Sequence, residues 1–91
     1  MQVKWTGTGL SDLARLHDFL APVNALAAAR VVQSLTAAAS NLADNPRIGR
    51  KLGQFEPREV RRIFAGAYEM RYEIAGAVIY VLRIWHARES R

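Results

Sequence analysis

Residues 59–91 read EVRRIFAGAYEMRYEIAGAVIYVLRIWHARESR, and the predicted fold is built around this stretch. Its middle part alternates between two sets of side chains: Tyr68, Met70, Tyr72 and Ile74 on one side, and Glu69, Arg71 and Glu73 on the other. A period of two predicts a half-buried strand. Residues 78–85 are apolar almost throughout, which predicts a strand inside the sheet with both faces covered.

Three strands are therefore expected at about residues 58–65, 68–75 and 78–85. The pairs Gly66-Ala67 and Ala75-Gly76 supply the flexible positions of two tight turns between them. An earlier strand is predicted at residues 2–5, where polar and apolar side chains alternate.

Two helices are predicted between the first strand and the last three. Thr8 is the expected N-cap of the first helix, and Asp12 is expected on its wet side. The apolar stripe of this helix is predicted to consist of Leu10, Leu13, Leu16 and Phe19 or Leu20. Asn24 is the expected cap of an alanine-rich helix over residues 25–43, whose apolar seam comprises Ala28, Val31, Leu35, Ala38 and Leu42.

Residues 47–57 contain glycines, a proline and three cations, and they are interpreted as a solvated connector. The element order is then β-α-α-β-β-β, which predicts an α+β domain spanning residues 1–91 with a helical hairpin packed on a mainly antiparallel sheet. The uncovered sheet face is expected to carry four charged side chains, Arg61, Glu69, Arg71 and Arg83.

The composition limits the function classes. The chain has 91 residues and a net charge of +5, which favours an acidic or polyanionic partner. It has no cysteine and two distant histidines, so neither a metal site nor a cofactor is expected. No signal peptide or membrane-spanning run is present in the sequence, and a cytoplasmic location with no membrane partner is expected.

Several segments together resemble the RelE/ParE superfamily, the small toxins of bacterial type II toxin–antitoxin systems. The segments are VKWT, the Asp12-Leu13 pair, LADNPRIGR, the V-R-R of the second predicted strand, YEMRYEI and VLRIWHARESR. The resemblance covers nearly the whole chain. It implies a β-α-α-β-β-β fold, growth arrest as the activity, and a cognate antitoxin that neutralises the toxin in a hetero-oligomer.

The resemblance implies two alternative targets. RelE-like members resemble ribosome-dependent endoribonucleases that cut mRNA, and ParE-like members poison DNA gyrase. RNA cleavage needs an acid, a base and cations. The candidates for these catalytic roles are His86, Arg88, Arg61 and Arg62.

Two departures from the RelE-like pattern favour the gyrase target and a toxin that is not an enzyme. Glu69 stands where the RNA-cleaving relatives usually carry an arginine, and the tail lacks the tyrosine that many of them use. The residues expected to bind the target are Arg71, Arg83, His86, Arg88 and Arg91.

The same cations have a second interpretation. Arg61, Arg71 and Arg83 are expected to receive an acidic antitoxin segment, whichever target the toxin has. His86 has a structural alternative, in which it holds the tail against the sheet through a hydrogen bond. A non-toxic interaction module derived from the family is the third hypothesis.

Overall fold

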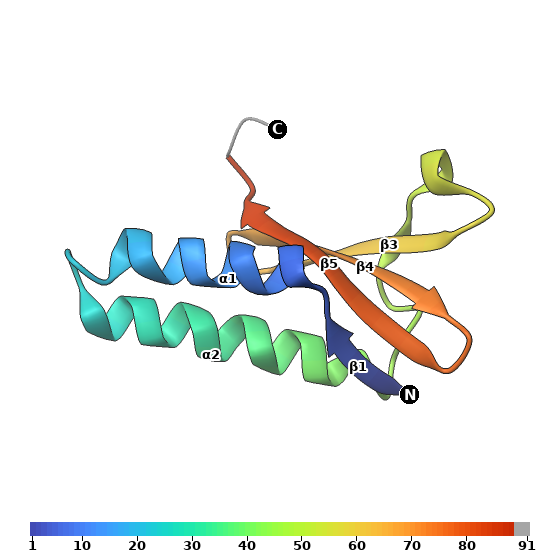
Figure 1. The fold of residues 1–91 in the computed structure, drawn as a ribbon, viewed down its shortest axis with the longest axis horizontal. Coiled ribbons are helices and arrows are strands. Elements are labelled where there is room, and N and C mark those ends of the chain that lie inside the picture. Colours follow the sequence, from blue (N-terminus) through green and yellow to red (C-terminus); the bar gives the residue numbers. More distant parts are fainter. Residues whose placement is uncertain (89–91) are drawn as a thin grey trace.

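A two-layer arrangement of a helical hairpin and a mixed sheet makes up the computed structural model, which describes residues 1–88 (Figure 1). The elements in chain order are β1 (Gln2–Trp5), α1 (Gly7–Leu20), α2 (Ala25–Asn41), β2 (Arg50–Lys51), the 3-10 turn η1 (Gly53–Phe55), β3 (Glu59–Ala65), β4 (Tyr68–Ala75) and β5 (Val78–His86). The predicted α+β fold and its order of main elements are confirmed.

The five strands lie in the order β1-β5-β4-β3-β2. β1 runs parallel to β5, and the other three pairings are antiparallel. The two hairpins turn at Gly66 and Gly76, both with φ of 60°, a conformation that glycine adopts without steric cost. The turns are therefore where the sequence predicted them.

The core lies between the helical hairpin and one face of the sheet. Met70, Tyr72 and Ile74 of β4 enter it, as the alternation predicted. They meet Leu16 of α1 and Leu35 of α2. Neither α1 nor α2 covers the opposite face of the sheet (Figure 1), and we call it the helix-free face.

The N-cap of α1 is Thr6 and not Thr8, so that prediction was wrong by two residues. The Thr6 hydroxyl accepts a hydrogen bond from the Gly9 amide and donates one to the Val81 carbonyl. The contact between α1 and β5 thus determines which residue caps the helix, and no local sequence pattern reveals this contact. Gly9 permits this contact, because a Cβ atom there would lie 2.5 Å from the Val81 oxygen.

Asp12 was expected on the wet side of α1, and this was also wrong. Its side chain is buried and accepts hydrogen bonds from the Ile84 amide at 2.9 Å and from Arg83 Nε at 2.8 Å. The reason is that β1 pairs with β5 only as far as Val81, so α1 covers the remaining edge of β5. Asp12 and Arg15 supply side-chain hydrogen bonds to the Ile84 amide and carbonyl there.

The apolar stripe of α1 is confirmed only in part. Leu16 is buried and Leu13 packs against the core, whereas Leu10 and Phe19 are exposed. In α2 the Asn24 cap is confirmed, since its side chain accepts a hydrogen bond from the Ala27 amide. Three members of the predicted seam, Ala28, Leu35 and Leu42, are fully buried, and Leu35 and Leu42 belong to the core.

The segment predicted as a solvated connector contains structure. β2 pairs with β3, and η1 brings Phe55 to the helix-free face, where its ring contacts Arg71. A two-residue strand and a single turn carry no periodicity, which is why the sequence did not predict them.

Candidate functional site

Four arginines form a row across the helix-free face. Arg50 of β2 pairs with Arg62 of β3. Arg62 also lies opposite Arg71 of β4, which in turn lies opposite Arg83 of β5. Directly opposite residues share a face, and like charges so placed destabilise a sheet. Residues that destabilise the fold in this way are expected at functional surfaces. We therefore treat this arginine row as the candidate site.

The guanidinium of Arg71 lies between two aromatic rings. Its Cζ atom is 5.1 Å from the centre of the Phe55 ring and 4.9 Å from the centre of the Trp85 ring. The face of an aromatic ring attracts a cation, and guanidinium groups stack well on such rings. These contacts fix the position of a central cation of the row.

Arg83 is held at the β5 end of the row by a carboxylate from α1. Its Nε donates to Asp12 Oδ2 at 2.8 Å, and its Cζ atom lies 5.7 Å from the centre of the Trp85 ring. About half of its side chain is still exposed, so the guanidinium also faces solvent.

The other two arginines differ in how they are paired. Arg62 Nη1 lies 3.9 Å from Glu69 Oε1, and its Cζ atom lies 5.4 Å from the centre of the Phe64 ring. Phe64 is 57% exposed, so a large aromatic side chain lies beside the row. Arg50 is exposed and makes no ion pair with any residue that the structure describes.

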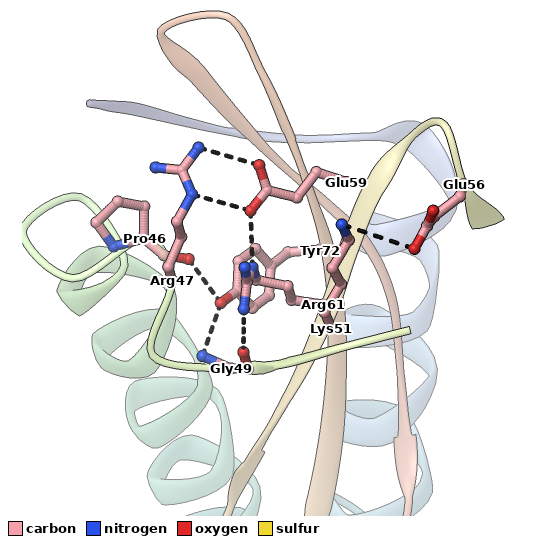
Figure 2. A network of polar contacts seen from close by, with 8 residues as sticks. All are labelled: Pro46, Arg47, Gly49, Lys51, Glu56, Glu59, Arg61 and Tyr72. Carbon is pink, nitrogen blue, oxygen red and sulfur yellow. Dashed lines mark hydrogen bonds and ion pairs between the residues drawn. The ribbon is translucent and has the colours of Figure 1, made fainter. Parts of the chain in front are cut away.

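On the helix side of the sheet, the Tyr72 side chain connects β4 to the loop that precedes β2 (Figure 2). Its hydroxyl donates to the Pro46 carbonyl at 2.7 Å and accepts from the Gly49 amide at 3.0 Å. Burial raises the pKa of this hydroxyl, which favours the protonated form that donates. A Cβ atom on Gly49 would lie 2.6 Å from both the Arg62 carbonyl and the Tyr72 hydroxyl, so a glycine is required there.

Arg61 belongs to the same network and not to the helix-free face. Its Nε donates to Glu59 at 2.8 Å, and its Nη1 donates to the Gly49 carbonyl at 2.8 Å (Figure 2). Arg47 adds two further hydrogen bonds to Glu59, at 3.0 Å each. The bonds from Arg61 and Arg47 hold the pKa of the Glu59 carboxyl below its usual range. The face predicted for Arg61 was wrong, because Arg61 lies opposite Tyr72, a core residue.

His86, at the end of β5, lies on the helix side of the sheet. Its Nδ1 accepts a hydrogen bond from the Arg88 amide at 3.1 Å, and its ring meets Tyr68 edge to face at 5.3 Å. A groove of about 500 Å³ opens beside it, lined by Arg15, Leu16, Phe19, Leu20, Tyr68 and His86.

The predicted site residues thus fall into separate places. Arg62, Arg71 and Arg83 come together in the row. His86 and Arg61 lie on the other side, four β4 positions apart, which is about 13 Å along the strands. The remaining two predicted cations are Arg88, which is exposed just after β5, and Arg91, which lies outside the described residues.

Arg50 is the member of the row that the sequence did not indicate as a site residue. It was placed in a connector, and only its pairing with Arg62 identifies it. Within residues 1–88, no cluster of three or more acidic or histidine side chains has the arrangement of a metal site. In the same part of the chain, no helix has the length and apolar character needed to cross a bilayer.

Sequence comparison gives two relatives of nearly equal length, both from Caulobacter vibrioides. The chain is 36% identical to Toxin RelE2 over 86 residues, which cover 94% of each protein. It is 38% identical to Toxin RelE1 over 81 residues, which cover 88% of this chain and 86% of that protein.

Two solved structures share the fold. A chain of the chromosomal ParDE toxin–antitoxin system from P. aeruginosa superposes with a TM-score of 0.78, at 22% identity and with 94% of this chain and 95% of that chain covered. A chain of the toxin–antitoxin complex RelBE2 from Mycobacterium tuberculosis gives a TM-score of 0.70, at 24% identity and with coverage of 93% and 95%.

The fold, a helical hairpin on a five-stranded mixed sheet, together with the two RelE relatives, identifies the chain as a toxin of the RelE/ParE superfamily. Residues 3–91 match the family described as the ParE toxin of the type II toxin–antitoxin system parDE, and the chain belongs to this family of toxins.

Proposed function

We propose that this toxin arrests growth by poisoning DNA gyrase and that it acts through the arginine row without cleaving RNA itself. One observation supports this most directly: within residues 1–88, the helix-free face carries no histidine. Histidine is the side chain whose ordinary pKa suits acid–base catalysis near neutral pH. His17 lies on α1, and His86 lies on the helix side of the sheet. The row offers cations for binding an anionic surface, and such binding does not require a histidine.

Cleavage of mRNA on the ribosome is the second candidate. It is favoured by the arginine row, which suits a phosphodiester backbone, and by the two relatives named RelE. Four residues were assigned to that chemistry, His86, Arg88, Arg61 and Arg62. His86 and Arg62 lie on opposite faces of the sheet, and Arg61 is bonded to Glu59 and Gly49, so this arrangement gives the nuclease less support.

A cognate antitoxin is the proposed partner, in a cytoplasmic toxin–antitoxin hetero-oligomer. Both solved relatives come from toxin–antitoxin assemblies. Arg71 and Arg83 are the row members proposed to meet acidic antitoxin side chains, whereas Arg61 is already engaged within the chain. Exposed apolar residues at the turn of the helical hairpin, Phe19, Val23 and Leu26, are the second proposed contact region.

A single pair of assays separates the targets. Purified toxin is added to a gyrase supercoiling reaction and to translating ribosomes programmed with a defined mRNA. We expect cleaved gyrase–DNA complexes to accumulate and the mRNA to stay intact. Codon-periodic cleavage of the mRNA would instead establish the nuclease. Inactivity in both assays, together with harmless overexpression, would favour the non-toxic interaction module.

A further inference from the structure

Glu69 is a buried carboxylate on the same face as the arginine row. It is 2% exposed and lies in register between Phe64 of β3 and Trp85 of β5. Its Oε1 lies 3.9 Å from Nη1 of Arg62. A buried carboxylate is costly unless cations or hydrogen-bond donors surround it. The Glu69 carboxylate therefore interacts electrostatically with the arginine row through Arg62.

This position affects what the row can bind. Residues two apart on a strand share a face, so Glu69 is a neighbour of Arg71 along β4 as well as of Arg62 across the strands. A phosphate placed between these two arginines would approach a fixed negative charge. The same carboxylate also pairs with Arg62, so this cation is less available to an incoming anion.

We propose that Glu69 is a specificity-determining residue, which keeps the arginine row from binding a nucleic-acid backbone and so reserves the row for a protein partner. This inference rests on the proposed function, in which the row meets gyrase or an antitoxin and not a scissile RNA. It assigns to Glu69 a role in discrimination between partners, in addition to its place in the fold.

Glu73 provides a matched control. It also lies two positions from Arg71 on the same face of β4, and it is also paired with an arginine. Its partner is Arg58, which lies outside the row and bonds it at 2.7 and 3.1 Å. Glu69→Gln and Glu73→Gln add the same charge to the protein, so a difference between them reports on the row and not on net charge.

The test is the binding of a fluorescein-labelled single-stranded RNA to the purified toxin, followed by anisotropy over a series of salt concentrations. For Glu69→Gln we expect a dissociation constant about fivefold lower at low salt, and a log–log salt slope steeper by roughly 0.7, the value for one added phosphate contact. Glu73→Gln should stay close to the wild type. Glu69→Met, an uncharged residue of similar length, should repeat the gain if the Gln variant folds poorly, and thermal unfolding of each variant reports folding.

Equal RNA affinity of the folded Glu69 and Glu73 variants would overturn the inference. The gyrase assay is independent of this result. If the Glu69 variants gain RNA affinity while the wild type fails to trap gyrase on DNA, the role of Glu69 stands and the proposed target fails. If gyrase is trapped while the Glu69 variants gain nothing, the inference about Glu69 alone fails.

Discussion

At the scale of single residues, the Tyr72 hydroxyl connects two parts of the chain that the sequence shows far apart. It bonds the Gly49 amide, 23 residues earlier, and the Pro46 carbonyl, 26 residues earlier. Of the two motifs, NPRIGR supplies residues of the loop, and YEMRYEI supplies the hydroxyl that holds it. The loop leads directly into β2, so the same hydroxyl helps to position Arg50.

Tyr72→Phe should therefore destabilise the protein. It leaves the Gly49 amide and the Pro46 carbonyl without their partner, which costs about 1–3 kcal/mol for buried groups. The measurement is the free energy of unfolding in urea. Tyr80→Phe is the control, because the Tyr80 hydroxyl makes no hydrogen bond within the described chain. Equal stability of the two variants would contradict the assigned role of Tyr72.

At the scale of elements, the approach of α1 to β5 is the contact that local patterns predicted least well. Gly9 lies against the Val81 carbonyl, whereas a Cβ atom on Gly7 would meet nothing within 4 Å. Both glycines belong to the first turn of α1. They therefore allow a comparison in which the helix is the same and only the contact with β5 differs.

We expect Gly9→Ala to destabilise the fold by about 1–3 kcal/mol, because the helix must move away from β5. Gly7→Ala should be neutral or should stabilise by up to about 1 kcal/mol through helix propensity. Thermal unfolding of both variants measures the difference. A Gly9 variant as stable as the Gly7 variant would show that α1 does not depend on close packing here.

The ion pairs of β3 and β4 make stability depend on pH. Hydrogen bonds from Arg61 to Glu59 and from Arg58 to Glu73 lower the pKa of both carboxyls from the ordinary value of 4.5. A lowered pKa in the folded state contributes stability that is fully present above pH 4.5 and is lost as the pH falls through the folded-state value.

We therefore predict that acidification from neutral pH to about pH 3 destabilises the wild type more than a Glu59→Gln, Glu73→Gln double variant. Urea unfolding at the two pH values gives the comparison. A double variant that loses as much stability as the wild type would mean that other groups cause the acid sensitivity.

The sequence correctly predicted the elements that have a distinctive local pattern of residues. The glycine turns and the alternation of β4 identified both hairpins, and Asn24 identified the start of α2. Prediction from the sequence failed where the contacting residue lies far away along the chain. Asp12 is polar on a helix, and only its contact with Ile84, 72 residues later, makes it a buried residue. The arginine row likewise depends on strand register, because a shift of one residue moves a side chain to the opposite face.

At the scale of the whole molecule, two surfaces of different character lie on different parts of the fold. The helix-free face carries the arginine row with Phe55, Phe64 and Trp85 nearby. The helical hairpin extends beyond the sheet (Figure 1), and its turn exposes Phe19 and Val23. A partner that wraps around the toxin can contact both surfaces, as we propose for the antitoxin.

We propose that the toxin acts through the surface formed by the arginine row. Arg50 tests it most cleanly, because this residue is exposed and has no ion pair within the described chain whose loss would disturb the fold. Arg30 is an exposed arginine on α2, away from the row, and Arg30→Glu makes the same change in net charge.

The measurement is growth after induction of each toxin variant in cells without an antitoxin, with expression levels matched. We predict that Arg50→Glu relieves growth arrest and that Arg30→Glu arrests growth like the wild type. Full arrest by a folded, equally expressed Arg50→Glu variant would show that the toxin does not act through the arginine row.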